Sequence, residues 1–297
     1  MNGKRMNQLT VIIPVYNEEA AIKNTLNELL EYSKSKNWEL LVVNDGSTDK
    51  TGEILQEYFS LTIVTHPYNK GYGASLKTGI KNASSELICF YDADGQHIPS
   101  DVENLLNNFN QFDMLVGARN KNSYTEWIRK PGKWILSKVA NFLTGRKIPD
   151  LNSGLRIIRK NLIIKLLHLF PEGFSFSTTS TIAFFNLGYN VGYFPITTRK
   201  RTGKSTVKQL KHGSNVILLI LRLIVLFNPL KVFIPVSLSV VLIGILYEFY
   251  QGVIVLGFEK ARLIPGAFFL IITGILIFFF GLVVDQISEM RKHQFND

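Results

Sequence analysis

The segment LICFYDADGQHIPSD, Leu87 to Asp101, decides how the N-terminal part of the chain is expected to fold. Its apolar run from Leu87 to Tyr91 predicts a buried strand. Two aspartates, Asp92 and Asp94, follow this run one residue apart. Carboxylates this close need a cation or a strongly polar surrounding. A plain turn that leads into a helix cap is the alternative interpretation.

Strand-like and helix-like patterns alternate around this segment. Short β-rich runs at Thr10–Val15, Glu39–Val43 and Leu61–Thr65 alternate with helical spacing in Glu18–Ser33, Thr51–Phe59 and Gly71–Asn82. This alternation predicts an α/β domain with a mostly parallel sheet flanked by helices. Ligands of such sheets bind beyond the C-terminal ends of the strands. The polar clusters that follow three strands are therefore expected to converge on one crevice: Tyr16–Glu18, Asn44–Gly46 and Asp92–Asp94.

These clusters allow specific chemistry. Asp92 and Asp94 are hard oxygen ligands that suit Mg²⁺ or Mn²⁺ shared with substrate phosphates, and Gln96 lies within reach of the same ion. The glycine-rich Asn69–Ser75 opens a helix, so its N–H groups could face phosphate; close packing of its backbone on the sheet is the alternative. Asp45 could accept a hydrogen bond from a nucleoside, or serve only as a turn or cap residue.

The chain becomes strongly apolar from Gly213 onward. Leu263 to Val284 carries no charge and is long enough to span a bilayer, and Val232 to Tyr247 reaches that length with its flanks. We therefore expect transmembrane helices at about 231–251 and 263–285. A pair of buried core helices is the alternative, but the rest of the chain is too small to enclose one.

Charge predicts the orientation of these spans. The net charge is +10 and the pI about 9.5. Gly173 to Tyr247 contains several Lys and Arg but no Asp or Glu, and Arg291 and Lys292 follow the second span. The positive-inside rule thus places the large N-terminal domain and the C-terminus in the cytoplasm. The single cysteine, Cys89, excludes a disulfide framework, and the N-terminal apolar run is too short for a signal peptide.

Two further stretches suggest contact with a membrane. Gly213 to Leu230 is apolar with Arg222 at its centre, which predicts an interfacial helix; a third span is the alternative. Gly117 to Lys147 mixes many basic residues with Trp127, Trp134 and other apolar residues, as at an anionic lipid surface; a solvated helix packed on the sheet is the alternative. Nucleic acid is not an expected partner, because no binding motif is present. The expected organisation is a domain at 1–212, an interfacial helix at 213–230 and a membrane hairpin at 231–297.

Several motifs occur together and in order: VIIPVYNEE, VVNDGSTDKT, NKGYGASLKTGI, YDADGQHIPSD, VGAR and DLNSGLRIIRK. As a set they resemble family 2 glycosyltransferases with the GT-A fold. The polyprenyl-phosphate branch of that family, which includes dolichyl-phosphate mannose synthase and bactoprenol glucosyltransferases, is the most similar. The resemblance covers roughly residues 9 to 210, and the basic RKRTGKSTV and the two spans also fit this branch.

The resemblance implies a role for each motif. It makes Asp92, Asp94 and Gln96 ligands of Mg²⁺ or Mn²⁺. It places Arg119 at the donor phosphates. The donor nucleoside would be surrounded by Pro14, Tyr16, Glu18 and Asp45, and a loop closing over donor and lipid phosphate would carry Arg199, Arg201, Lys204 and Ser205. Asn44 departs from the pattern, since many relatives have Asp there, but we expect little effect on the metal.

The implied reaction is an inverting, metal-dependent transfer of one sugar from a UDP- or GDP-linked donor. The acceptor would be undecaprenyl or dolichyl phosphate at the cytoplasmic membrane face. A phosphate monoester has a second pKa near ~6, so it is already a nucleophile and needs no strong base. Asp150 would then orient the phosphate or the sugar, or form only a loop turn. Gly173–Ser180 would line the sugar or lipid-phosphate site, or merely pack a helix start.

Two other functions fit parts of the sequence pattern. A related enzyme that glycosylates a lipid hydroxyl, such as that of a diacylglycerol, would need a true base, which would make Asp150 indispensable. A non-catalytic scaffold that binds nucleotide sugar is disfavoured by the intact Asp92/Asp94 pair and the basic loop. The sequence leaves open the sugar, the nucleotide, the polyprenol and whether the chain forms a homo-oligomer.

Overall fold

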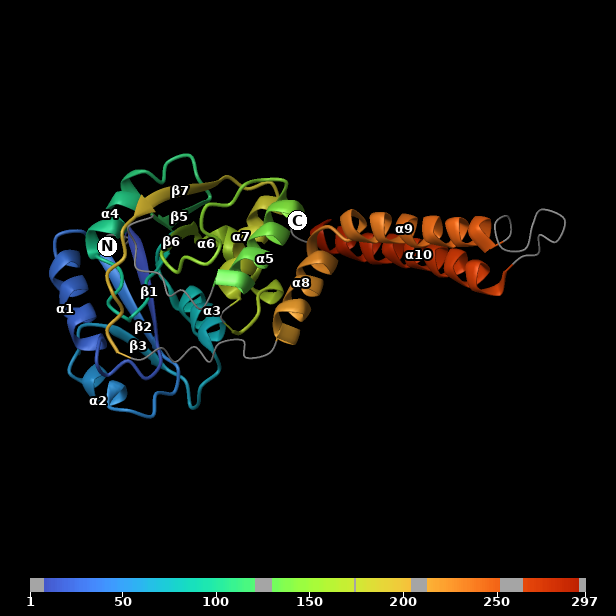
Figure 1. The fold of residues 1–297 in the computed structure, drawn as a ribbon. Helices are drawn as coiled ribbons and strands as arrows, with labels where there is room; N and C mark the ends of the chain where they lie inside the picture. The colour runs from blue at the N-terminus through green and yellow to red at the C-terminus, as the bar shows by residue number, and fades with distance from the viewer. Residues whose placement is uncertain (1–7, 121–129, 174, 204–212, 252–263, 294–297) are drawn as a thin grey trace. The chain divides into compact units, whose positions relative to one another are not determined.

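The computed structural model describes residues 8–120, 130–173, 175–203, 213–251 and 264–293 (Figure 1). Its contacts divide the chain into two compact units, Met1–Gly213 and Ser214–Asp297. The strands of the first unit are β1 (Leu9–Val15), β2 (Trp38–Asn44), β3 (Thr62–Thr65), β4 (Leu87–Phe90), β5 (Met114–Arg119), β6 (Arg156–Arg159) and β7 (Val191–Ile196). Its helices are α1 (Ile22–Ser33), α2 (Thr51–Gln56), α3 (Tyr72–Asn82), α4 (Pro99–Asn107), α5 (Lys130–Thr144), α6 (Lys160–Lys165), the short 3₁₀ helix η2 (Leu167–Leu169) and α7 (Phe176–Asn186).

One sheet of seven strands organises this unit, in the order β3-β2-β1-β4-β6-β5-β7. β1 pairs in parallel with β2 and β4, β2 with β3, and β5 with β7. Only β6 runs antiparallel to its neighbours β4 and β5. The predicted fold class, a mixed and mostly parallel sheet flanked by helices, is confirmed.

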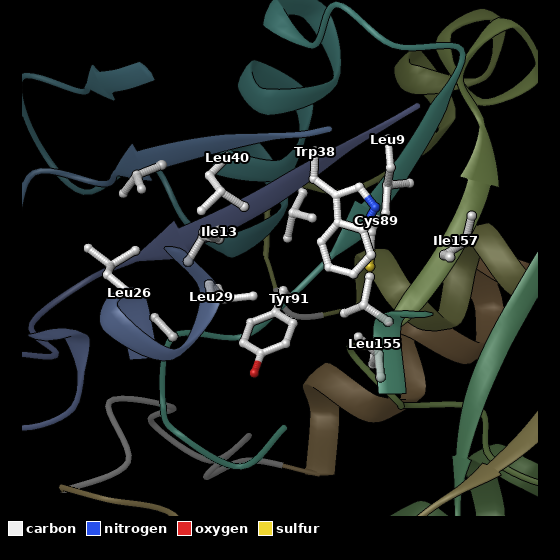
Figure 2. Packing of buried hydrophobic residues seen from close by; sticks show 14 of the residues in the cluster. Leu9, Ile13, Leu26, Leu29, Trp38, Leu40, Cys89, Tyr91, Leu155 and Ile157 are labelled. Carbon is white, nitrogen blue, oxygen red and sulfur yellow. The ribbon is translucent and has the colours of Figure 1, made fainter. Parts of the chain in front are cut away.

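Helices cover both faces of the sheet (Figure 1). On one face, Leu26 and Leu29 of α1 pack in a buried cluster with Ile13 of β1 and with Trp38 and Leu40 of β2 (Figure 2). Full burial of each such side chain contributes about 1.5–3 kcal/mol. This packing buries one face of β1, and α3 covers Ile12 on the other, so all seven residues of the strand are buried.

α3, α6 and α7 lie on the opposite face (Figure 1). Phe176 of α7 packs edge-on against Phe90 at the end of β4 and against Phe170, with ring centroids 5.9 and 4.9 Å apart. α7 is buried on all sides although it carries Ser177 to Thr181, a run of five hydroxyl residues.

The first helix begins later than predicted, at Ile22 instead of Glu18. Asn17 has φ +53°, and the N–H groups of Ala21 and Ile22 both donate to the carbonyl of Glu18, at 3.0 and 2.9 Å. Glu18 therefore belongs to the turn after β1, at the same sheet edge as the other polar clusters.

The second unit contains α8 (Gly213–Phe227) apart from its first residue, α9 (Leu230–Phe249) and α10 (Pro265–His293). α9 and the segment Pro265–Met290 are apolar and long enough to cross a membrane. The break before α9 falls at Pro229, which lacks an N–H donor and restricts the residue before it. The interfacial position predicted for 213–230 stays a prediction.

Small residues let α9 and α10 pack closely. An ideal Cβ on Gly274 would lie 2.5 Å from Val241, and one on Gly244 would lie 2.9 Å from Ile271. Large apolar side chains such as Leu242 and Phe279 point outward and are more than half exposed. This pattern is typical of helices that pack through small residues and face lipid.

The contact between α3 and β1 yields a stability prediction. A Cβ on Gly79 would lie 2.3 Å from Cγ2 of the fully buried Ile12, so Gly79→Ala forces the packing apart. We expect a loss of about 1–3 kcal/mol, although alanine gains about 1 kcal/mol in helix propensity. In Gly52→Ala, the matched control in α2, the new methyl would meet its nearest atom at 3.7 Å. Thermal unfolding should show a midpoint lowered by several degrees for Gly79→Ala alone; equal midpoints would contradict this packing.

Candidate active site

A pocket of about 430 Å³ lies at the C-terminal ends of β1, β2 and β4. It is lined by Pro14, Val15, Tyr16, Glu18, Asp45, Asn69, Gly71, Tyr72, Ser75, Asp92, Ala93, Asp94 and Arg201. The three polar clusters that follow these strands are thus brought together. The glycine-rich segment before α3 and Arg201, which comes after β7, complete the wall.

Asp92 is held in place from two sides. Its Oδ1 accepts a hydrogen bond of 3.0 Å from the hydroxyl of Tyr72. Gly154 packs so closely that an ideal Cβ there would lie 2.1 Å from Asp92 Oδ2, so a side chain at this position would displace the carboxylate. The Nε2 atom of His97 lies 3.8 Å from the same Oδ2 atom. The carboxylate is therefore fixed before any ligand arrives.

The two aspartates differ in their proton affinity. Burial favours the neutral form of Asp92, but the nearby His97, the hydrogen bond from Tyr72 and the charge of Arg119 outweigh this and lower its pKa. Burial and the negative charge of Asp92 raise the pKa of Asp94, although Arg201 opposes the increase. A bound cation would favour ionisation of both groups.

The pocket suits a divalent cation shared with a substrate. In the described part of the chain, no group of three or more His, Cys, Asp or Glu side chains is arranged to hold a metal by itself. Asp92 and Asp94 would supply two oxygen ligands, and Mg²⁺ commonly takes its remaining ligands from phosphate and water. Gln96, predicted as a third ligand, is outside the pocket lining; its N–H donates to Asp94 Oδ1 at 3.1 Å.

Arg201 lies over the carboxylates at the mouth of this site. Its guanidinium pairs with Glu18, and its Nη1 lies 3.4 Å from Asp94 Oδ2. The backbone next to it is fastened to the aspartate turn, because Thr202 N donates to Asp94 O at 3.1 Å and Arg199 N donates to Gln96 O at 2.9 Å. A cationic group thus already sits where negative charge gathers.

Asp45 lies in the pocket wall, but its oxygens are engaged by the chain. They accept from the N–H groups of Lys70 and Gly71 at 2.9 and 2.8 Å, and His66 Nδ1 lies 2.7 Å away. Gly71 has φ +105°, a conformation that favours glycine, and a Cβ there would meet Glu172 O at 2.6 Å. Asp45 therefore fixes the glycine-rich segment, a role that the sequence pattern did not indicate.

Arg119 and Asp150 form a two-point ion pair beside the pocket. Arg119 Nε and Nη2 donate to the two carboxylate oxygens of Asp150 at 2.7 and 2.8 Å. Burial alone would raise the pKa of Asp150, but the hydrogen bonds and charge of Arg119 lower it. Neither residue lines the pocket itself, although the charge of Arg119 reaches Asp92. An acid this well paired is a weak base.

The other predicted residues fall in different places. Pro14 and Tyr16 line the pocket as expected. Arg199 points away from it and pairs with Glu28 at 3.0 Å. Lys204 and Ser205 lie outside the described residues. The sequence pattern does not reveal the roles of Tyr72 and Gly154, because their contacts with Asp92 join separate segments of the chain.

Glu18 yields a pH prediction. Burial raises its pKa from the usual 4.5 to about 7, against the opposing charge of Arg201. Between pH 4.5 and 7, Glu18 keeps its proton in the folded protein but loses it in the unfolded chain. The free energy of unfolding therefore falls as the pH rises towards 7. Between pH 4.5 and 7.5, with EDTA present, wild type should lose roughly 2–4 kcal/mol more of its free energy of unfolding than Glu18→Gln does. Its thermal midpoint should therefore fall further than that of the variant. Parallel pH profiles for the two proteins would contradict the raised pKa.

Comparisons with known proteins agree with this geometry. The family model Glycosyl transferase family 2 matches residues 10–167, and the model GtrB C-terminal hairpin matches residues 228–290. Probable glycosyltransferase YdaM of Bacillus subtilis is 31% identical over 65% of this chain and 50% of its own length. Undecaprenyl-phosphate 4-deoxy-4-formamido-L-arabinose transferase of Proteus mirabilis is 28% identical over 55% of this chain and 52% of its own length. The matches thus span only about half of these relatives.

A solved structure shares the fold. Glucosyl-3-phosphoglycerate synthase from Mycobacterium tuberculosis, crystallised with Mn²⁺, uridine diphosphate and glucosyl-3-phosphoglycerate, is similar with a TM-score of 0.58. The likeness covers 73% of this chain and 79% of that one, at 18% sequence identity. It confirms the GT-A-like arrangement of the sheet, and the family match covers more than half of the residues. The chain therefore belongs to glycosyltransferase family 2 and carries a GtrB-type C-terminal hairpin.

Proposed function

We propose that this protein moves one sugar from a nucleotide sugar to a polyprenyl monophosphate at the cytoplasmic face of a membrane, with inversion at the anomeric carbon. The observation that carries the proposal is the gathering of Asp92, Asp94 and Arg201 in one pocket with Pro14 and Tyr16. A bound diphosphate requires positive charge, which Arg201 and a cation on Asp92 and Asp94 would supply. The nucleoside would pack against Pro14 and Tyr16 beside them. The name of the Proteus mirabilis relative, an undecaprenyl-phosphate transferase, supports the acceptor class.

Charge movement explains the residues of the site. An oxygen of the acceptor phosphate attacks the anomeric carbon while the bond between that carbon and the donor diphosphate breaks. The acceptor changes from a dianion to a singly charged diester, and the departing nucleoside diphosphate gains the negative charge. Bound Mg²⁺ or Mn²⁺ would neutralise part of that charge. Arg201 lies at the pocket and can exchange its pairing with Glu18 and Asp94 for the diphosphate.

The state of Asp150 favours a phosphate acceptor over a lipid hydroxyl. A hydroxyl must lose a proton, which requires a base with a pKa near the working pH. Asp150 is bound at both oxygens by Arg119, and that pairing lowers its pKa. We assign Asp150 to the orientation of Arg119, which would then face the phosphates.

The surface of the first unit offers a place for lipid. Trp134 and Phe142 of α5 are 64% and 54% exposed, and Lys138, between them, lies with Nζ 5.8 Å from the Trp134 ring centroid. Residues four apart share one helix face, so aromatic and basic groups form a single stripe. Such stripes suit an interface of anionic lipid. We propose that this stripe and the hairpin of α9 and α10 hold the catalytic domain at the membrane.

The proposal is tested by a transfer assay with the full chain. Purified protein would be incubated with undecaprenyl or dolichyl phosphate, Mg²⁺ or Mn²⁺ and a panel of labelled nucleotide sugars. Label should enter the organic phase from one donor. EDTA should abolish transfer, and Asp94→Ala should lower the rate about 10²-fold or more. Glu53→Ala, which changes an exposed acid on α2, serves as the control and should leave the rate unchanged.

The outcomes are distinct. A product that mild acid cleaves would establish a sugar monophosphoryl lipid and identify the sugar. No transfer from any donor by folded protein would refute the polyprenyl-phosphate assignment and favour another lipid acceptor.

Asp150→Asn separates the two acceptor classes. If the acceptor is a phosphate, the variant loses the orientation of Arg119 and slows about 10- to 100-fold. The pH dependence of its kcat should keep the wild-type shape, because no base has been removed. If the acceptor is a hydroxyl, wild type itself should be inactive with every polyprenyl phosphate, its transfer to diacylglycerol should fall at low pH as the base is protonated, and Asp150→Asn should abolish that transfer.

A further inference from the structure

Arg156, the first residue of β6, is fully buried. Its Nη1 donates to Ser177 O at 3.0 Å, Ser180 Oγ at 3.2 Å and Thr181 Oγ1 at 3.0 Å, and its Nη2 donates to Ser153 O. All of these acceptors are neutral. No ion pair in the described part of the chain includes Arg156.

A buried guanidinium without a direct carboxylate partner is unusual, because its desolvation costs several kcal/mol. Charged side chains are rarely buried unless they are paired. Burial lowers the pKa of Arg156, and the nearby Tyr72 and Tyr193, followed by Asp150 and Asp92, oppose that effect. Its guanidinium is therefore held by neutral acceptors of α7 and of the loop before β6 instead of by a direct carboxylate.

The hydrogen bonds of Arg156 lead to Asp92 by two routes. The first runs through Ser153, whose carbonyl Arg156 holds. The next residue is Gly154, which packs directly on Asp92 Oδ2. A shift of this loop would release one side of the Asp92 carboxylate.

The second route runs through the start of α7. Arg156 holds the carbonyl of Ser177, and the hydroxyl of Ser177 interacts with Tyr72. Tyr72 in turn donates to Asp92 Oδ1. Both oxygens of Asp92 are thus supported by segments that one buried guanidinium joins.

We propose that Arg156 is a positioning residue that fixes the Asp92 carboxylate for cation binding, through Ser153–Gly154 on one side and Ser177–Tyr72 on the other. The proposal deepens the proposed function, on which it rests, since the cation would be the Mg²⁺ or Mn²⁺ of sugar transfer. Arg156 would thus influence metal affinity although it does not line the pocket.

The test measures Mn²⁺ affinity of the full chain in detergent, by the electron paramagnetic resonance signal of free Mn²⁺, with UDP or GDP present. Arg156→Met should weaken Mn²⁺ binding about 10- to 100-fold, as loss of a supporting contact to a ligand does. Arg156→Lys keeps the positive charge but can form fewer hydrogen bonds. Its affinity for Mn²⁺ should therefore lie between those of Arg156→Met and wild type. Arg159→Met is the matched control: Arg159 lies on the same strand but is half-exposed and pairs with Asp113, so affinity should not change.

A double substitution tests the route. Tyr72→Phe alone should weaken Mn²⁺ binding, and its effect should be less than additive with that of Arg156→Lys, because both act on Asp92. Full additivity would overturn the Tyr72 route. If Arg156→Met does not fold, the Mn²⁺ affinities of Arg156→Lys and of the double variant still test the proposal.

A purely structural role has a different signature. It would lower the thermal midpoint and leave the Mn²⁺ affinity of the folded protein within twofold of wild type, and that result would overturn the proposal. Failure of the proposed function is distinguishable: wild type would then bind Mn²⁺ but transfer no sugar, and the comparison of affinities would still stand. Wild type that binds no Mn²⁺ with either nucleotide would overturn the inference outright.

Discussion

The first unit depends on neutralising carboxylates that its parallel strands bring to one edge of the sheet. β1, β2 and β4 deliver Glu18, Asp45, Asp92 and Asp94 to a single pocket. Like charges this close destabilise a fold unless each is matched by hydrogen bonds or cations. Each acid has different partners. Asp45 accepts hydrogen bonds from main-chain N–H groups and lies against His66. Asp92 accepts from Tyr72 and lies near His97, and Arg201 pairs with Asp94 and Glu18.

These solutions differ in how readily a ligand can displace them. The groups around Asp45 and Asp92 belong to packed segments, so those carboxylates stay fixed. Arg201 reaches Asp94 and Glu18 from the segment after β7, and its long side chain can turn to another anion. A site with one rigid and one exchangeable set of partners suits catalysis in which negative charge arrives with the donor and grows as the diphosphate leaves. The low pKa of Asp150 fits the same picture, because a phosphate acceptor brings its own charge and requires no base.

The resemblance found in the sequence proved correct at the level of family and fold. The motifs VIIPVYNEE, VVNDGSTDKT and YDADGQHIPSD end strands, and an open parallel sheet gathers strand ends at one edge. The apolar hairpin was equally readable, since Leu230–Phe249 and Pro265–Met290 are long enough to span a membrane. The residue roles were harder to predict. Gln96 and Arg199 sit beside the pocket without lining it, because turn geometry directs their side chains, and spacing along the chain does not report turn geometry.

The sequence by itself determined the alternation of strands and helices, the acidic turn after β4 and the two long apolar helices, because periodicity and composition are local properties. Tertiary structure alone decided the partners of the acids. Arg119 and Asp150 are 31 residues apart, and Glu18 and Arg201 are 183 apart. It also placed Arg156 in the core, although an arginine in a sequence normally predicts an exposed position. The two ion pairs form only when distant strand ends meet at one edge of the sheet, and the burial of Arg156 depends on the packing of α7 against β6. No local pattern encodes a contact whose two halves come together only after folding.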